Sequence, residues 1–163
     1  MGTEVPASDR SVDILLVEDN PEDHALTSLA LLRQQLSNRI HVVRDGQEAL
    51  DYVFCLGPYA DRQMTDQPRV ILLDLNLRLI DGLEVLRRLK GDPETQTIPV
   101  VMLTSSDDDR DLIESYRLGA NSYIVKPVAF DQFKQAVQLI AAYWLQVNRP
   151  LAAAEALGAI IPS

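Results

Sequence analysis

Five short runs rich in aliphatic residues divide the chain into units of similar length. They cover residues 12–17, 40–43, 70–73, 98–103 and 122–125. In the third run, four consecutive apolar and partly β-branched residues end abruptly in Asp74. Such a run is typical of a strand buried on both faces, as in the middle of a parallel sheet. The pattern predicts five strands.

Between these runs, apolar residues recur at three- and four-residue steps, which is typical of helices with one buried face. The expected helices begin after residues 20, 45 and 81, at residue 107 and at about residue 129. Asn20 followed by Pro21 is a favourable start, because Asn accepts hydrogen bonds from the free amides of a first turn. The residues expected on buried helix faces are Leu26, Leu29, Leu32 and Leu36, then Ala49, Leu50, Val53 and Phe54, then Leu83, Val85, Leu86 and Leu89.

Strand and helix alternate five times along the chain, without an internal repeat. This alternation predicts an α/β fold in which a five-stranded parallel sheet has right-handed crossovers and helices on both faces. The expected domain covers residues 12–149. Residues 1–11 are expected to be a disordered lead-in, and the pattern does not determine the structure of the tail, 150–163.

Composition excludes several classes of function. The chain has 163 residues, enough for one domain, and a net charge of −9, which argues against a nucleic-acid surface. No apolar stretch approaches the roughly 18 residues of a membrane span. Cys55 is the only cysteine, so an intrachain disulfide and a multi-cysteine metal site are both excluded. A cytoplasmic protein without membrane or nucleic-acid partners is expected.

Reactive residue types follow four of the five expected strands. Glu18-Asp19, Asp74, Thr104 and Lys126 would all meet at one edge, because parallel strands point their carboxyl ends the same way. Alone, Asp74 is more simply explained as the cap of a loop. Together, the carboxylates suit Mg²⁺, and the lysine and hydroxyl suit a transferring phosphoryl group. Asp74 would be the nucleophile that forms an acyl phosphate.

At this point the sequence resembles a response-regulator receiver domain over residues 12–149. The resemblance implies the flavodoxin-like strand order 2-1-3-4-5. It also implies that the protein is a switch and not an enzyme. The only reactions of such a switch are its own phosphorylation and dephosphorylation. The matching motifs are Glu18-Asp19-Asn20-Pro21, Asp74-Leu75-Asn76, Asp81-Gly82, Thr104-Ser105-Ser106 and Tyr123-Ile124-Val125-Lys126-Pro127.

The resemblance further implies the roles of the acidic residues. Asp74 would accept a phosphoryl group from the phosphohistidine of a sensor histidine kinase. Asp19 and Asp74 would bind Mg²⁺ directly, together with the backbone carbonyl of Asn76. Glu18 would act on the metal through a water molecule.

The remaining roles implied by the resemblance concern the switch. Thr104 would turn towards the phosphoryl group, and Tyr123 would swing inward behind it. Lys126 would pair with a phosphoryl oxygen, and its bond to Pro127 would be cis.

More narrowly, the chain is similar to single-domain regulators of cyanobacterial-type phytochrome histidine kinases. The similarity lies in the motifs at 40–46, 74–77 and 126–133 and in Tyr143-Trp144-Leu145. The chain departs from the receiver pattern at Arg78, where a proline is usual. We expect this change to loosen the turn and to add a charge beside the site.

The last expected helix offers an output surface. Packing on the sheet explains part of the apolar stripe along this helix. Leu139, Tyr143 and Leu145, however, extend the apolar surface beyond one face of the helix. We therefore expect a homodimer through the fifth strand and flanking helices, with Tyr143 and Trp144 near the contact. The stripe comprises Phe130, Phe133, Val137, Ile140, Trp144 and Val147.

Two other functions fit parts of the pattern. A Mg²⁺-dependent aspartyl-phosphate phosphatase would generally have a second Asp two residues after its nucleophile, where this chain has Asn76, and would need a substrate cap. A degenerate receiver acting as a constitutive binding module would usually lack the acceptor Asp, an acidic partner or the Lys. All of these are present.

Overall fold

The computed structural model describes residues 12–32 and 40–151 of the chain. The expectations for residues 1–11, for the side chain of Leu32, for Leu36 and for the tail beyond Leu151 lie outside the described residues. Within these limits, each helix is too short or too polar to cross a membrane.

The described strands form one parallel sheet in the order β2-β1-β3-β4-β5, as the sequence predicted. Strands β2, β3 and β5 have the predicted bounds, whereas β1 and β4 each begin two residues later than predicted and β4 extends to Thr104. The bounds are β1 Ile14–Val17, β2 Ile40–Val43, β3 Val70–Leu73, β4 Val100–Thr104 and β5 Ser122–Val125.

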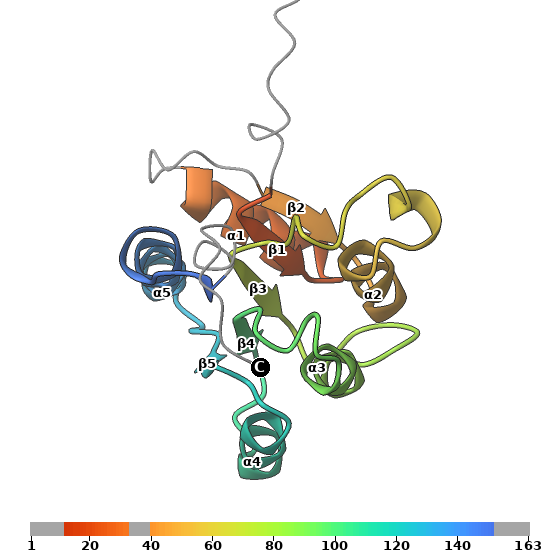
Figure 1. Ribbon diagram of the computed structural model, residues 1–163. Coiled ribbons are helices and arrows are strands. Elements are labelled where there is room, and N and C mark those ends of the chain that lie inside the picture. Colours follow the sequence, from red (N-terminus) through yellow and green to blue (C-terminus); the bar gives the residue numbers. More distant parts are fainter. Residues whose placement is uncertain (1–11, 33–39, 152–163) are drawn as a thin grey trace, which may run out of the picture.

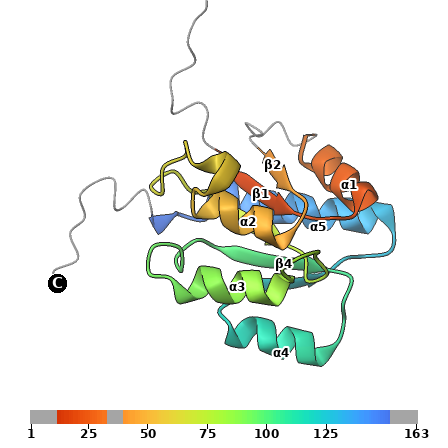
Figure 2. The ribbon, with the colours of Figure 1, turned by 90° about the vertical axis from the view of Figure 1, so that its right-hand side faces the viewer.

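Helices cover both faces of the sheet (Figure 1). Helices α1 and α5 share one face, while α2 and α3 share the other, with α4 beside α3 and β5. Figure 2 shows α2 and α3 in front of the sheet and α5 behind it. The bounds are α1 Pro21–Leu32, α2 Gly46–Val53, α3 Gly82–Gly91, α4 Asp109–Arg117 and α5 Phe130–Ala142, with short helices η2 Gly57–Tyr59 and η3 Tyr143–Val147.

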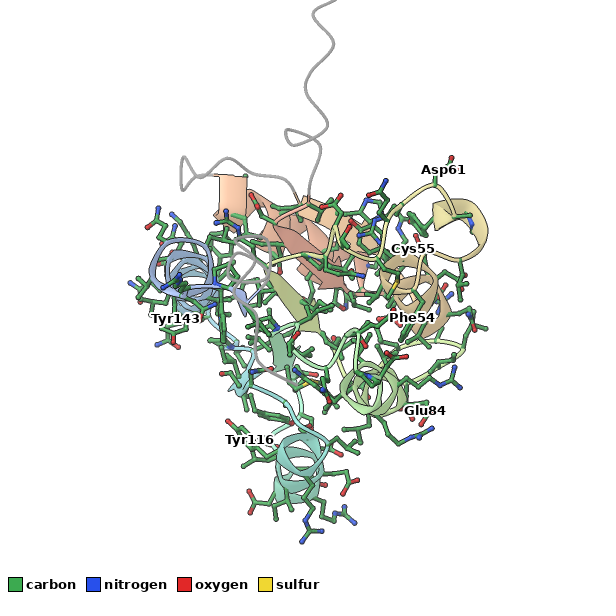
Figure 3. The ribbon with its side chains drawn as sticks, viewed as in Figure 1. Phe54, Cys55, Asp61, Glu84, Tyr116 and Tyr143 are labelled. Atoms are coloured by element: carbon green, nitrogen blue, oxygen red, sulfur yellow. The ribbon has the colours of Figure 1, made fainter. Side chains whose placement is uncertain are left out.

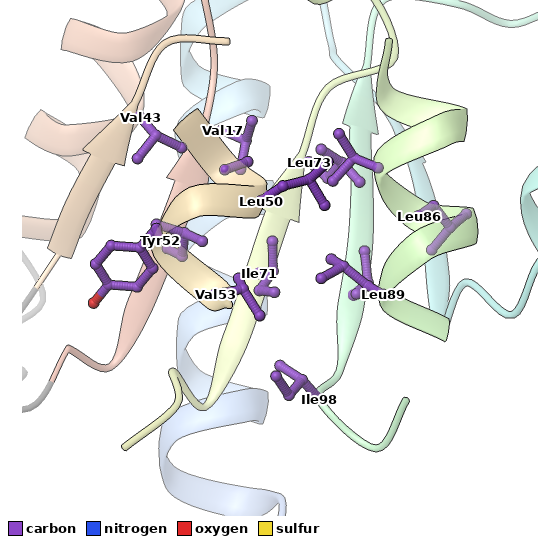
Figure 4. Packing of buried hydrophobic residues seen from close by; sticks show 14 of the residues in the cluster. Val17, Val43, Leu50, Tyr52, Val53, Ile71, Leu73, Leu86, Leu89 and Ile98 are labelled. Atoms are coloured by element: carbon purple, nitrogen blue, oxygen red, sulfur yellow. The ribbon is translucent and has the colours of Figure 1, made fainter. Parts of the chain in front are cut away.

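Each strand of the sheet's interior contributes to two cores. The alternation of side chains sends Ile71 and Leu73 towards α2 and α3, and Val70 and Leu72 towards α1 and α5. All four β3 side chains are fully buried, which confirms the prediction of a strand covered on both sides. Figure 4 shows the first of these cores, where Leu50 and Val53 of α2 and Leu86 and Leu89 of α3 pack on the sheet.

The buried face of α1 differs from the expected one. Leu29 is 42% exposed, while Thr27, Ala30 and Leu31 are buried. The reason is that α1 carries small and apolar residues around most of its circumference. Packing against the sheet and α5, rather than residue spacing, therefore determines which side is covered.

The stripe on α5 is confirmed only in its middle. Phe133, Val137 and Ile140 are buried, whereas Phe130 and Val147 at its two ends are exposed. The α-helix also ends at Ala142 rather than at about residue 146, and the chain continues as the π-helical turn η3. Within η3, Trp144 and Leu145 still pack against the core between the sheet and α1 and α5, whereas Tyr143 and Val147 are exposed.

Close backbone contacts require glycine at the start of α2 and of α3. A Cβ atom at Gly82 would lie 2.1 Å from the carbonyl oxygen of Asp74, and one at Gly46 would lie 1.8 Å from the carbonyl oxygen of Ile80. The Asp81-Gly82 motif therefore lets α3 begin directly against Asp74, the residue that follows β3. Asp81 caps this helix by accepting a hydrogen bond from the backbone N–H of Glu84.

Replacing Gly82 by alanine should destabilise the protein by about 1–3 kcal/mol, because the added methyl group would collide with the backbone of Asp74 and Leu75. Urea unfolding measures the loss. Gly91→Ala is the matched control, since nothing lies within 4 Å of a Cβ at that end of the same helix. In Gly91→Ala the free energy of unfolding should stay unchanged or rise by roughly 0.5–1 kcal/mol. Equal losses in both variants would contradict the close-approach argument.

Candidate functional site

Four strands bring a reactive side chain to one edge of the sheet. Glu18 follows β1, Asp74 follows β3, Thr104 ends β4 and Lys126 follows β5. The in-register pairing of β1 with β3 and of β4 with β5 places these ends side by side. The predicted convergence is therefore present.

The ammonium group of Lys126 lies among three carboxylates. Its Nζ donates to Glu18 Oε2 at 2.5 Å, to Asp23 Oδ2 at 2.8 Å and to Asp74 Oδ2 at 2.8 Å. The side chains of Lys126, Glu18 and Asp74 are only 8%, 3% and 7% exposed, whereas that of Asp23 is 32% exposed. Lys126 is thus the buried counter-ion of the site.

A single ammonium faces more negative charge than it can neutralise. Burial raises the pKa of the Glu18 carboxyl to about 7. The hydrogen bond from Lys126 opposes this rise, and the nearby Asp74 carboxylate adds to it. Burial would lower the pKa of Lys126, but its hydrogen bonds to Asp23, Asp74 and Glu18 prevail and hold that pKa above its ordinary value. The excess negative charge favours a further cation.

In Glu18 and Asp74, the carboxylate oxygen that Lys126 does not contact accepts a hydrogen bond from a backbone N–H group. The N–H of Asn20 donates to Glu18 Oε1, and the N–H of Asn76 donates to Asp74 Oδ1, both at 3.1 Å. The Asn20 side chain also accepts hydrogen bonds from the backbone N–H groups of Glu22 and Asp23, as expected for the cap of α1. Both carboxylates are therefore oriented before any ligand arrives.

Sequence reasoning missed Asp23. It is not among the predicted site residues, yet it lies in the first turn of α1 and its carboxylate contacts Lys126. The signal that could have found it is the position of α1, which begins four residues after β1 ends and therefore at the edge where the site lies. Side chains of such a first turn lie close to the strand ends.

Asp19 lies apart from the contacts of Lys126. It is half-buried and lines a cavity of about 330 Å³ beside Glu18. The cavity carries charges of both signs. Its lining residues are Glu18, Asp19, Pro21, His24, Arg44, Asp45 and Arg78.

The donor atoms at this edge fit a hard divalent cation in type. Glu18, Asp19 and Asp74 offer carboxylate oxygens, the ligands that Mg²⁺ and similar ions prefer. They are not gathered around a metal position: in residues 12–32 and 40–151, no three Asp, Glu, His or Cys side chains form such a group. The reason is that Lys126 Nζ lies between Glu18 and Asp74.

Thr104 and Tyr123 are joined through Ser106. Thr104 Oγ1 accepts a hydrogen bond from the Ser106 N–H at 3.2 Å, and the Tyr123 hydroxyl donates to the Ser106 carbonyl at 2.9 Å. The Ser106 hydroxyl in turn donates to Asp111 Oδ2 at 2.6 Å. The two predicted switch residues, on β4 and β5, therefore contact the same loop residue, Ser106, which sequence reasoning did not identify as their connection.

The expected cis bond between Lys126 and Pro127 is wrong. The described part of the chain contains no cis peptide bond. The trans form is the lower in energy for an X–Pro bond, by about 0.5–1 kcal/mol. In this form the Lys126 N–H donates to the Thr104 carbonyl at 2.7 Å, so the backbone still directs the side chain into the site.

The turn after Asp74 is closed without the usual proline. The Arg78 carbonyl accepts hydrogen bonds from the N–H of Ile80 at 2.8 Å and of Gly46 at 3.3 Å. Leu79 adopts a positive φ of 65°, which is strained for a residue with a side chain, and it is 81% exposed. The Arg78 side chain lines the cavity, as expected for a charge beside the site.

The fold and the convergent carboxylates, hydroxyl and lysine define the class of protein. The family model of the response regulator receiver domain matches residues 14–138. The chain belongs to this family of two-component response regulators, for which phosphorylation and divalent-metal binding are typical.

Particular relatives refine this assignment. The probable methanogenesis regulatory protein FilR2 of Methanothrix harundinacea is 43% identical over 136 residues, 83% of this chain and 85% of FilR2. Response regulator Rcp1 of Synechocystis is 38% identical over 133 residues, 82% of this chain and 88% of Rcp1.

Solved structures point to the same group. The Mn²⁺-bound form of Rcp1 has a TM-score of 0.79 at 36% identity, covering 86% of this chain and 98% of that one. The phosphorylated cyanobacterial phytochrome response regulator RcpA has a TM-score of 0.79 at 41% identity, covering 84% and 96%. The chain is therefore similar to phytochrome response regulators in sequence and in structure.

Replacing Lys126 by methionine should lower the free energy of unfolding by about 3–5 kcal/mol in metal-free buffer, because Glu18 and Asp74 would stay buried without a cation. Mg²⁺ should restore part of the loss, since a cation that binds only the folded state stabilises it. Urea unfolding with and without Mg²⁺ measures both effects. The control is Lys134→Met on α5, which should change stability by less than about 0.5 kcal/mol. Similar losses in the two variants would show that Lys126 is not the counter-ion of the site.

Proposed function

We propose that Asp74 accepts a phosphoryl group from the phosphohistidine of a sensor histidine kinase. The observation that carries this proposal is a buried carboxylate at the end of a central strand, hydrogen-bonded by Lys126 and by the Asn76 amide. In the proposed domain organisation, residues 12–149 form the receiver. The output is a change in protein contacts, and the protein is a switch without a separate substrate.

The proposed transfer is a substitution at phosphorus. A carboxylate oxygen of Asp74 forms the new P–O bond while the P–N bond to the kinase histidine breaks, and the imidazole nitrogen keeps the electron pair of that bond. Lys126 lies 2.8 Å from Asp74 Oδ2 and is placed to donate to a phosphoryl oxygen. Its positive charge offsets charge that collects on the transferring group.

The residues that would hold Mg²⁺ are Asp19 and Asp74, the backbone carbonyl of Asn76 and, through water, Glu18. A bound Mg²⁺ ion would offset the negative charge of the carboxylates and of the incoming phosphoryl oxygens. Rcp1, which has a Mn²⁺-bound structure, supports a divalent-ion site of this kind. Asn76 in place of a second carboxylate supports a switch over a phosphatase with its own substrates.

The proposed response to phosphorylation involves Thr104 and Tyr123. Thr104 Oγ1 would exchange the Ser106 N–H for a phosphoryl oxygen, to which it would donate its own proton. Ser106 would then lose its contact with Thr104 while keeping the one with Asp111, and Tyr123, whose hydroxyl donates to the Ser106 carbonyl, would turn inward. The shared loop supports this coupling.

The proposed kinase is of the phytochrome type. Similarity to Rcp1 and to the phytochrome regulator RcpA supports this choice. The cytoplasm is the proposed location, as is usual for receiver domains, and the net charge of −9 supports a surface without nucleic-acid binding.

Incubation with acetyl phosphate and Mg²⁺ should add the mass of one phosphoryl group to the wild-type protein and none to Asp74→Asn, because the amide is not a nucleophile. Intact-protein mass spectrometry measures the change. Asp51→Asn is the control, since that carboxylate lies on α2 and accepts from Gln47 rather than from Lys126. Phosphorylation that persists in Asp74→Asn would refute the assignment.

We further propose a homodimer through β5 and the flanking helices. Strand β5 is an edge of the sheet, and exposed apolar side chains lie near it on α4 and at the end of α5. Figure 3 shows Tyr116 of α4 and Tyr143 on the side of the molecule that carries β5. Trp144 is half-buried and packs edge-on against the Tyr143 ring, with 4.9 Å between centroids, so it holds Tyr143 in place.

Leu139→Ser should raise the dimer dissociation constant at least about tenfold, because Leu139 is 72% exposed and would lose apolar contact with a second copy. Light scattering over a concentration series measures the constant. Leu56→Ser is the matched control, because Leu56 is also exposed but lies beyond α2 on the far side of the sheet. A wild-type protein that is strictly monomeric, with and without phosphorylation, would rule out the dimer.

A further inference from the structure

Two arginines line the cavity beside the site without a partner of their own. Arg44 directly follows β2, and Arg78 lies in the turn after Asp74; both line the cavity of about 330 Å³. Within the described part of the chain, neither guanidinium group forms an ion pair or a hydrogen bond, whereas that of Arg87, for example, contacts Glu84. Two uncommitted positive charges therefore face one cavity.

The backbone holds the two arginines at this cavity. The Arg78 carbonyl accepts a hydrogen bond from the Gly46 N–H at 3.3 Å, which joins the loop after β3 to the loop after β2. The Arg44 N–H donates to Glu48 Oε2, also at 3.3 Å. Both arginines thus start from fixed backbone positions in loops that touch each other.

The carboxylates of the cavity have roles that leave the arginines available. Glu18 accepts a hydrogen bond from Lys126, and Asp45 caps α2 by accepting one from the Glu48 N–H at 2.7 Å. Asp19 is a proposed ligand of Mg²⁺. The two guanidinium groups are therefore available to an anion from outside the protein, and a carboxylate suits them because it can accept two parallel N–H bonds from one guanidinium.

The cavity lies next to the phosphoacceptor rather than around it. Glu18, which lines the cavity, contacts Lys126 at 2.5 Å, and Lys126 contacts Asp74 at 2.8 Å, but Asp74 is not a lining residue. In a phosphoryl transfer, the leaving group lies on the side of the phosphorus opposite the attacking oxygen. A cavity one residue removed from Asp74 suits the part of a donor that is not transferred.

We propose that Arg44 and Arg78 bind the carboxylate leaving group of a small acyl phosphate, which makes such compounds a second class of phosphodonor beside the phosphohistidine. A carboxylate oxygen of Asp74 forms the new P–O bond while the bond between phosphorus and the acyl oxygen breaks. The acyl oxygen keeps the electron pair of that bond and leaves as part of a carboxylate anion. The guanidinium groups offset the negative charge that grows on it. The inference rests on the proposed function of Asp74.

A donor with a neutral leaving group separates this role from a general effect on the site. Phosphoramidate also carries a transferable phosphoryl group, but its P–N bond breaks and the nitrogen leaves as uncharged ammonia. The arginines then have no growing negative charge to offset. They should therefore matter for acetyl phosphate and not for phosphoramidate.

The test compares the rate constants of phosphorylation by these two donors, measured by intact-protein mass spectrometry over time with Mg²⁺. Salt at about 0.15 M screens charges that lie more than about 8 Å apart. Arg44→Ala and Arg78→Ala should each lower the rate constant for acetyl phosphate about fivefold and change that for phosphoramidate by less than about twofold. Arg117→Ala is the matched control, because it removes the same charge from the last turn of α4, away from the cavity. It should change neither rate constant by more than about twofold.

Arg78→Lys keeps the charge but not the paired N–H groups and should recover part of the loss, so a folding defect of the alanine variant would not decide the outcome. Unchanged rates with acetyl phosphate, equal losses with both donors, an equal loss in Arg117→Ala or no recovery in Arg78→Lys would overturn the inference. A loss confined to phosphotransfer from the kinase would assign the arginines to kinase docking and would also overturn it. A wild-type protein that neither donor phosphorylates, or labelling that persists in Asp74→Asn, would instead overturn the proposed function, and the inference with it.

Discussion

The site depends on one buried ammonium group that is outnumbered by carboxylates. Lys126 is 8% exposed and contacts Glu18, Asp23 and Asp74 at 2.5–2.8 Å. Without it, two buried carboxylates would face each other across adjacent strands, which is unfavourable in a low-dielectric interior. With it, the edge still carries excess negative charge. This excess charge favours a further cation at the edge of the sheet.

The topology of the sheet creates this arrangement. Parallel strands in the order β2-β1-β3-β4-β5 bring Glu18, Asp74, Thr104 and Lys126 to one edge, although they are far apart in the chain. The backbone then determines each position closely. The Lys126 N–H is bonded to the Thr104 carbonyl, and the Asn76 N–H is bonded to Asp74. Lys126 contacts Asp74 directly, and Thr104 and Tyr123 are both hydrogen-bonded to Ser106.

The sequence was sufficient for the sheet and for most of the site, because both depend on local signals. A fully apolar run that ends in Asp74 indicates a central strand whatever surrounds it, and strand ends are where parallel sheets bind ligands. The contacts of Asp23, Ser106 and Asp111 were not predictable in this way. They depend on where the first turn of α1 and the loop after β4 lie in space, which residue spacing does not specify.

Two other expectations failed. The buried side of α1 depends on its packing partners, since Leu29 and Ala30 are both compatible with a covered face. The isomer of the Lys126–Pro127 bond was inferred from family resemblance alone, and it is trans. In the first case the local sequence allows more than one buried face and packing determines the outcome; in the second, the bond has the isomer that is ordinarily lower in energy.

Chemical mapping of the phosphorylated residue tests the central assignment most directly. Phosphotransfer from a phosphorylated phytochrome histidine kinase, followed by borohydride reduction, converts an aspartyl phosphate to homoserine, which peptide mass spectrometry then locates. The account predicts homoserine at position 74 and at no other acidic residue. Modification at a different carboxylate, such as Asp19 or Asp23, would contradict it.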